Sequence, residues 1–195
     1  MEYGPTTALI VVDVQNDFAD PKGNLSVPGG EDVIDFINEQ IQAASRAGSP
    51  VVYTQDWHPE STPHFEVEGG IWPVHCVADT FGAELHPALK VIEGAVRVKK
   101  GVGGEDGYSA FNVRDPETGN ETATGLANQL RNSGVERVAV LGLALDYCVR
   151  ESALDATSAG FETTLLADGT RPVNLRLGDG ARAVASLVEA GVAVE

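Results

Sequence analysis

Short apolar runs rich in β-branched residues alternate along the chain with longer segments in which apolar residues recur every three or four positions. The short runs predict strands, and the longer segments predict amphipathic helices. This alternation is typical of an α/β fold whose parallel sheet is covered by helices. We therefore expect a three-layer αβα, Rossmann-like architecture with about six mainly parallel strands. The predicted strands are 8–12, 51–54, 95–98, 138–141, 163–166 and 192–194, and the predicted helices are 33–44, 123–132, 147–159 and 180–189.

Two stretches of the chain show no sustained period. Residues 56–90 contain all four histidines and both tryptophans, and residues 101–122 separate the third predicted strand from the following helix. Loops of this length are uncommon in a compact domain unless they have a function. A chain of 195 residues has the size of one domain, and we expect a single domain over 1–195.

Four chemically capable residues follow the predicted strands. Asp13 ends the first strand, and Asp56 lies just past the second. Lys100 lies just past the third strand, and Cys148 follows the fourth by a short turn. Because the carboxyl ends of parallel strands meet at one edge of the sheet, where ligands bind, we expect these residues to share one site.

Cys148 is predicted to lie in the first turn of a helix, with Asp146 as the N-cap. There the helix dipole favours a thiolate, and free N–H groups can receive an oxyanion. A carboxylate such as Asp13 at the end of an apolar strand is costly to bury without a partner of opposite charge, and Lys100 offers one. Together with Cys148, these residues supply a base, a cation and a nucleophile. Strand alternation sends Lys99 and Lys100 to opposite sides, and only one of them enters the site. The alternatives are an unreactive buried cysteine and a carboxylate that only caps a loop.

The loop 56–90 carries a candidate metal site. Asp56 and His58 project to the same side of an extended segment, and His64 and His75 follow in the same loop. Oxygen and nitrogen ligands of this kind suit one divalent Zn, Fe or Mn ion, whereas Ca and Mg prefer oxygen alone. The alternative is a set of scattered loop histidines. We interpret His86, which precedes a proline, as structural.

The charge balance limits the partners. Lys and Arg number 13 against 29 Asp and Glu, which gives a net charge of −16 and disfavours nucleic acid and anionic membranes. High-salt adaptation and ordinary selection for solubility both produce such a balance. Two cysteines, Cys76 and Cys148, are too few for a disulfide scaffold, and there is no signal peptide or long apolar run. A cytoplasmic protein with a small-molecule substrate is expected, and the sequence leaves homo-oligomerisation open.

Taken together, these segments resemble the nicotinamidase (pyrazinamidase) branch of the isochorismatase-like cysteine hydrolases, over nearly the whole chain. The resemblance implies the isochorismatase-like fold. Asp56, His58, His64 and His75 narrow the resemblance to the nicotinamidase branch, because many members of the wider family lack these metal ligands. The Gly-rich, acidic segment 101–107 departs from the family pattern and affects the placement of Tyr108. The matching stretches are 11–18, 56–58, 64–65, 72–76, 100–101, 108–111 and 142–148.

The resemblance also implies roles for individual residues. Cys148 would be the nucleophile, Asp13 the general acid and base, and Lys100 the residue that orients Asp13. A non-proline cis peptide would fall at Leu143–Ala144, with the Ala144 and Cys148 amides as the oxyanion hole. The metal ligands would be Asp56, His58, His64 and His75, and the substrate would contact Phe18, Trp72, Tyr108 and Leu143.

The implied reaction is hydrolysis of nicotinamide, and of pyrazinamide, through a cysteine thioester, in NAD salvage. Another amide or ureide hydrolase of the superfamily would keep Asp13, Lys100 and Cys148 without needing the metal ligands. A protein of a different class, a non-catalytic metal-binding or thiol-redox protein, would use Cys76 and Cys148 instead.

Overall fold

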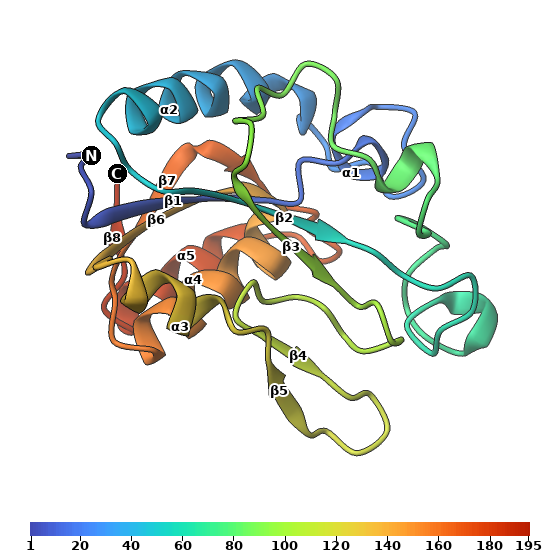
Figure 1. Cartoon of the computed structure of the whole chain (residues 1–195). Coiled ribbons are helices and arrows are strands. Elements are labelled where there is room, and N and C mark those ends of the chain that lie inside the picture. The colour runs from blue at the N-terminus through green and yellow to red at the C-terminus, as the bar shows by residue number, and fades with distance from the viewer.

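A six-stranded parallel sheet forms the centre of the computed structural model, which describes residues 1–195 (Figure 1). The strands lie in the order β3-β2-β1-β6-β7-β8, and every neighbouring pair is parallel. The predicted six-stranded α/β architecture is therefore confirmed. The strands are β1 (Thr7–Val12), β2 (Val51–Asp56), β3 (Val96–Lys100), β6 (Arg137–Leu143), β7 (Glu162–Arg171) and β8 (Ala193–Val194).

Helices cover both faces of the sheet (Figure 1). One face is covered by α2 (Ile34–Arg46), and the other by α3 (Leu126–Asn132), α4 (Arg150–Ser158) and α5 (Asp179–Glu189). No helix combines the length and the apolar character that a membrane crossing requires.

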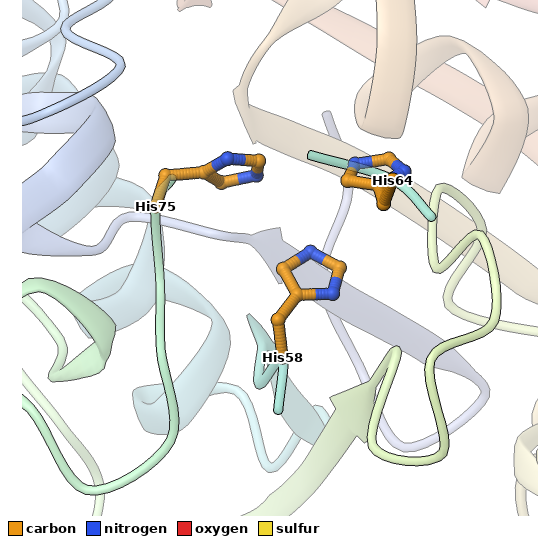
Figure 2. A group of neighbouring side chains, drawn as sticks. All are labelled: His58, His64 and His75. Carbon is orange, nitrogen blue, oxygen red and sulfur yellow. The ribbon is translucent and has the colours of Figure 1, made fainter. Parts of the chain in front are cut away.

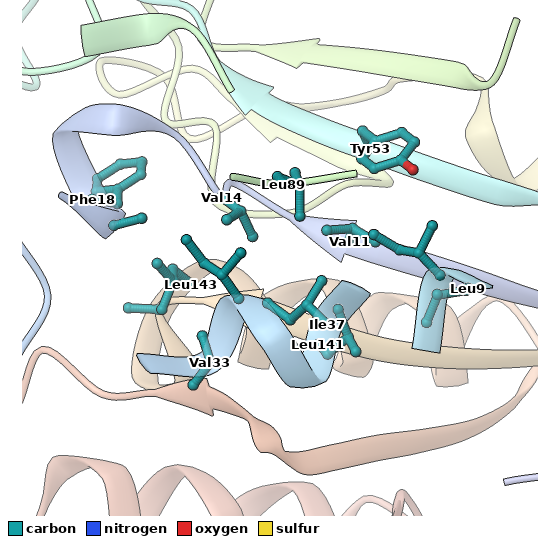
Figure 3. Close-up of a cluster of buried hydrophobic side chains, with 14 of the residues drawn as sticks. Leu9, Val11, Val14, Phe18, Val33, Ile37, Tyr53, Leu89, Leu141 and Leu143 are labelled. Carbon is teal, nitrogen blue, oxygen red and sulfur yellow. The ribbon is translucent and has the colours of Figure 1, made fainter. Parts of the chain in front are cut away.

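Alternation along β1 divides the core into two layers. Leu9 and Val11 pack with Ile37 of α2, as Figure 3 shows, whereas Ile10 and Val12 pack on the opposite face with residues of α4 and α5. All six residues of β1 are buried, which is expected for a central strand of a parallel sheet that is covered on both sides. The two layers hold β1, and with it Asp13, in a fixed position.

The strand order reverses between β1 and β6. From β1 the chain passes through α2 to β2 on one side, and from β6 it passes through α4 to β7 on the other side. The carboxyl ends of β1 and β6 therefore border a crevice, which is where open α/β sheets bind ligands. Asp13 follows β1 directly, and Cys148 follows β6 after a turn.

The predicted loops contain elements that the sequence pattern does not indicate. Residues 101–122 were expected to lack structure, but they hold most of an antiparallel hairpin made by β4 (Asn112–Arg114) and β5 (Glu121–Ala123). These strands have three residues each and are too short to show alternation. Because β5 extends to residue 123, the next helix begins at residue 126. Short helices also lie at Asn16–Ala19 (α1), Glu31–Val33, Glu66–Glu68 and Phe81–Ala83.

Candidate active site

Asp13, Lys100 and Cys148 come together at the crevice, as the sequence predicts. The Lys100 Nζ atom lies 2.7 Å from Asp13 Oδ2 and 3.8 Å from Cys148 Sγ. All three side chains are buried. The carboxylate of Asp13 also accepts a hydrogen bond of 2.5 Å from the Thr54 hydroxyl, so Asp13 is held from two directions.

Lys100, and not Lys99, is the lysine of the site. Its ammonium donates to Asp13, to Asp56 Oδ1 at 2.5 Å and to the Gly107 carbonyl oxygen, so its three protons all have partners. Lys99 lies on the other side of β3, where its Nζ atom is 3.1 Å from the centre of the Trp57 ring. The alternation of side chains along β3 is therefore confirmed, and it selects one lysine.

The position after Lys100 requires a glycine for a steric reason. Gly101 has φ +71°, and a Cβ atom there would lie 2.6 Å from the His58 ring. Gly142, in the strand before Cys148, has φ +116°, and a Cβ atom there would lie 2.1 Å from the Val12 carbonyl oxygen. Both glycines let the backbone approach neighbouring parts of the site more closely than any other residue would.

The buried charges shift the protonation equilibria of the site. Burial raises the pKa of Asp13 to about 6, although the Lys100 ammonium and the Thr54 hydroxyl act in the opposite direction. Burial opposes the charged form of Lys100, but Asp13 and Asp56 hold the pKa of Lys100 well above its usual value. Burial also raises the pKa of the Cys148 thiol well above its usual value. The thiol is therefore protonated at rest, and the helix position alone does not produce the expected thiolate.

His58, His64 and His75 converge in front of the sheet edge (Figure 2). One ring nitrogen from each lies within 4.8 Å of the other two, and all three residues are buried. Asp56 Oδ2 lies 3.7 Å from His58 Nε2 and 3.9 Å from His75 Nε2. The three predicted histidines thus lie together, and Asp56, at the end of β2, lies beside two of them.

The donor atoms of this cluster fit a divalent metal ion. Both ring nitrogens of His58 are buried with no hydrogen-bond partner, an arrangement that proteins avoid unless another group satisfies the nitrogens. Burial lowers the pKa of His75 to about 4, so its imidazole is neutral and can ligate. Despite its burial, Asp56 is kept ionised, because Lys100 and the histidines lower its pKa. Three imidazoles and a carboxylate suit a transition metal.

Backbone and side-chain acceptors orient two of the histidines. His75 Nδ1 lies 2.7 Å from the Pro73 carbonyl oxygen, and His64 Nδ1 lies 2.8 Å from Asp106 Oδ1. In both rings this leaves Nε2 for a metal.

A small aromatic pocket joins the cysteine to the histidines. Phe18, Trp72 and Tyr108 line it, as the resemblance implies. The Trp72 indole N–H donates to the Tyr108 hydroxyl at 2.9 Å, which fixes both rings. Tyr108 therefore reaches the pocket despite the unusual segment before it. The pocket lining also includes Leu25, Tyr147 and Val173, which cannot be recognised in the sequence because no charge or motif distinguishes them.

The turn between β6 and α4 differs in part from expectation. The peptide bond Leu143–Ala144 is cis, as the resemblance implies, and the Ala144 N–H donates to no other group of the chain. Cys148 lies in a π-helical turn, Leu145–Val149, which leads into α4. Leu143 does not line the pocket: its side chain points into the core beneath α2 (Figure 3), so the expected substrate contact is wrong.

Asp146 is not the expected N-cap. The helical turn begins after Ala144, and no side chain caps it. The Asp146 carboxylate instead accepts hydrogen bonds of 2.8 Å from the backbone N–H groups of Val173 and Asn174. The side chain thus ties the loop after β7, which carries Val173 of the pocket, to the turn that carries Cys148.

Two further residues have structural roles. Cys76 is buried, and its backbone N–H donates to Asp17 at 2.7 Å. Its side chain packs in the layer beneath α2, whereas Cys148 packs in the layer on the other face of the sheet, so the two thiols do not form a pair. His86 Nδ1 accepts the Ala88 N–H at 3.3 Å, away from the other histidines, in agreement with its structural interpretation.

Gln15 is a supporting residue that the sequence pattern does not indicate. Its side-chain amide donates to the Asp56 carbonyl oxygen at 2.7 Å and accepts from the Asp56 N–H at 2.8 Å. This double contact fixes the backbone that carries both Asp56 and the first histidine. A glutamine two residues after Asp13 has no property in the sequence that shows which backbone it holds.

A buried thiol beside a carboxylate and an ammonium, at the switch point of a parallel sheet, defines an α/β protein equipped for covalent chemistry with cysteine. The chain belongs to the isochorismatase family, because the isochorismatase domain matches residues 7–192.

Similar proteins of known structure or curated function extend the comparison. The chain is 36% identical to the nicotinamidase of Escherichia coli, over 96% of this chain and 93% of that protein. The crystal structure of Pyrococcus horikoshii pyrazinamidase in complex with zinc superposes with a TM-score of 0.87 at 40% identity, covering 98% and 99% of the two chains. PnC1 from L. infantum, in complex with nicotinate, gives a TM-score of 0.90 at 38% identity, covering 100% and 95%.

Proposed function

We propose that this chain is a metal-dependent cysteine amidohydrolase that converts nicotinamide to nicotinate and ammonia. The observation that carries the proposal is the Lys100 ammonium, which holds Asp13 beside Cys148 and Asp56 beside the histidines. A nucleophilic centre and a ligand cluster thus open into one aromatic pocket. The likeness to the nicotinamidase of Escherichia coli and to a nicotinate complex supports this substrate.

Acylation begins with proton transfer from sulfur to oxygen. At neutral pH, Asp13 is ionised and the Cys148 thiol is protonated, so Asp13 accepts the thiol proton as sulfur adds to the carboxamide carbon. The carboxamide oxygen becomes negatively charged and is held by the backbone N–H groups of Ala144 and Cys148. Protonated Asp13 then gives its proton to the nitrogen, the carbon–nitrogen bond breaks, and ammonia leaves a thioester on Cys148.

Deacylation uses the same residues in reverse order. Ionised Asp13 takes a proton from water as the water oxygen adds to the thioester carbon. The carbon–sulfur bond then breaks, and sulfur recovers its proton from Asp13. The product leaves as nicotinic acid, which gives its carboxyl proton to water and becomes nicotinate. Lys100 stays charged throughout, because the Asp56 carboxylate remains beside it while Asp13 carries the proton, and it keeps Asp13 in place for both transfers.

Asp56, His58, His64 and His75 would hold one divalent metal ion. When bound, the metal supplies a Lewis-acidic partner for the pyridine nitrogen of the substrate. Phe18 and Trp72 would contact the flat faces of the ring, and the cluster would face its edge, so the carboxamide carbon is directed toward Cys148. Because a pyrazinamidase of this family binds zinc, zinc is the first metal to test, before iron and manganese.

The test measures ammonia release from nicotinamide, pyrazinamide and benzamide by purified protein with zinc and after chelation. We expect turnover of nicotinamide and pyrazinamide, loss of that turnover with the chelator, and recovery when zinc is restored. Nicotinate must form in equal amount to ammonia. An absence of ammonia from nicotinamide in zinc-replete protein would refute the proposal, and turnover that chelation does not reduce would point to an amide hydrolase without a metal requirement.

A further inference from the structure

Asp106 contacts the ligand cluster from outside, although it belongs neither to the catalytic centre nor to the ligand set. Its Oδ1 atom lies 2.8 Å from His64 Nδ1, and the two residues are 42 positions apart in the sequence. The His64 side chain is only 4% exposed, and that of Asp106 is 28% exposed. The carboxylate thus contacts one ring nitrogen of a histidine whose ring also lies against the rings of His58 and His75.

The backbone around Asp106 is fixed by the hairpin that follows it. The Asp106 N–H donates to the Arg114 carbonyl oxygen at 2.7 Å, and the Arg114 N–H donates to the Asp106 carbonyl oxygen at 3.0 Å. Arg114 is the last residue of β4 and pairs with Glu121 beside the hairpin turn, so this end of the hairpin determines where the Asp106 carboxylate points. These contacts use only the backbone and survive a change of the side chain.

A second contact joins the same two segments. The Thr62 hydroxyl donates to the Gly104 carbonyl oxygen at 3.1 Å and accepts the His64 N–H at 3.3 Å. His64 itself lies in a segment without helix or strand structure. Its position therefore depends on the segment 101–107, which the sequence marks only as rich in glycine and acidic residues.

The carboxylate determines which nitrogen of His64 carries the proton. A carboxylate can only accept, so the ring donates its Nδ1 proton to Asp106 and keeps a lone pair on Nε2. Such a partner fixes the orientation of a ligating imidazole and increases its basicity. His75 has a backbone carbonyl in this role and His58 has no partner, so Asp106 is the one charged acceptor among these contacts.

We propose that Asp106 is a positioning residue of the metal site: it holds His64 in the Nδ1-protonated tautomer, with Nε2 directed at the metal. The inference rests on the metal site of the proposed function. It does not depend on which amide the enzyme hydrolyses.

The test compares variants of neighbouring residues. Asp106→Ala removes the acceptor, and Asp106→Asn restores an acceptor without the charge. Glu105→Ala is the matched control, because the Glu105 carboxylate contacts only the Gly103 N–H at 2.8 Å and leaves His64 untouched. His64→Ala gives the affinity that remains when the ligand itself is lost.

Two measurements that need no turnover report the effect. The first is the zinc dissociation constant from competition with a chromophoric chelator, and the second is the His64 tautomer from nitrogen-15 NMR of metal-free protein at pH 8. We expect Asp106→Ala to weaken zinc binding by about 10- to 100-fold and to reduce the Nδ1-protonated tautomer. Asp106→Asn should restore the tautomer and part of the affinity, and Glu105→Ala should change neither.

If the zinc affinity of Asp106→Ala lies within about threefold of that of Glu105→Ala, the inference is overturned. The inference is also overturned if His64→Ala binds zinc as tightly as the parent protein. An unchanged His64 tautomer in Asp106→Ala would also overturn it. Ammonia release by the parent protein is measured in parallel. If zinc binding responds as expected but nicotinamide is not hydrolysed, the proposed substrate is wrong and the role of Asp106 stands.

Discussion

Replacing Lys100 with methionine tests the centre of the proposed mechanism. Methionine has nearly the volume of lysine and no charge, so the change removes the ammonium and leaves most of the packing. Lys100 Nζ lies 2.7 Å from Asp13 Oδ2 and 2.5 Å from Asp56 Oδ1, and all of these atoms are buried. The variant therefore leaves two buried carboxyl groups without their counter-ion.

The size of the effect follows from these distances. Coulomb's law with an effective dielectric constant of about 20 gives an attraction of about 6 kcal/mol at the Lys100–Asp13 separation. Relaxation of the site reduces the cost, and removal of one partner of a buried ion pair typically costs about 3–5 kcal/mol. Since a pKa change of one corresponds to about 1.4 kcal/mol, the lower bound raises the pKa of Asp13 by about 2. From about 6 in the parent, that pKa moves to about 8 or above.

At pH 7.5, Asp13 of the variant is then largely protonated and cannot accept the thiol proton. Loss of a positioned general base lowers kcat/KM by about 100- to 10,000-fold. The assay is ammonia release from nicotinamide between pH 5 and 10, together with the thermal midpoint and zinc content. We expect the acid limb of kcat/KM to move from about pH 6 to above pH 8, so that part of the lost activity returns at high pH.

Lys99→Met is the matched control. The Lys99 ammonium lies over the Trp57 ring on the exposed side of β3, where such a contact contributes about 0.5–1 kcal/mol. We expect activity within twofold of the parent and a small decrease in the thermal midpoint. Equal loss of activity in the two variants, or an acid limb of Lys100→Met that stays near pH 6, would refute the reasoning.

Three further predictions concern the same site. Cys148→Ala should abolish turnover while zinc content and the circular dichroism spectrum stay unchanged, and substantial residual turnover would exclude Cys148 as nucleophile. In the parent, kcat/KM should decrease when the pH is lowered beneath about 6, because Asp13 then becomes protonated. The same proton affects stability, because the folded chain binds it more tightly than the unfolded chain does. Asp13 therefore stabilises the fold at low pH, and this contribution is lost as the pH rises through about 6. His58→Ala should lower kcat/KM for nicotinamide far more than for benzamide, which has no ring nitrogen. In the parent, kcat/KM for nicotinamide should exceed that for benzamide by up to about 10,000-fold. Comparable kcat/KM values for the two substrates in the parent would exclude metal contact with the ring.

The sequence predicts the sheet and the convergence of Asp13, Lys100 and Cys148 well, for a physical reason. The strands are apolar runs buried on both faces, and the residue after each run must lie at the common edge of a parallel sheet. Asp13 and Lys100 are recognisable because a charge at the end of such a run requires a partner. Alternation along β3 limits the choice to one of two adjacent lysines, and the structure shows which of the two is buried.

The supporting contacts could not be predicted in the same way. Asp106 and Gln15 act through residues about 40 positions away, so their roles depend on how loops fold against one another. Asp146 shows the same limit, because its spacing before the helix is that of an N-cap, whereas its carboxylate binds the loop after β7. A local pattern identifies the residue type, and tertiary contacts decide which backbone groups it satisfies.

Strand register joins the two halves of the site. Asp56 pairs with Lys100 and Gln55 with Lys99 in the β2–β3 ladder, so the residue opposite Asp56 is the lysine that points inward. One Asp56 oxygen then receives the Lys100 ammonium while the other faces the histidines. A slip of one residue would turn Lys100 outward and separate both carboxylates from their cation. Gln15 binds both backbone groups of Asp56 and so fixes the end of β2 at the point where this pairing matters. Asp56 of the proposed ligand set and Lys100 of the proposed catalytic centre are therefore positioned by the same two hydrogen-bonded strands, and a change that loosens either strand end should impair metal binding and acylation together.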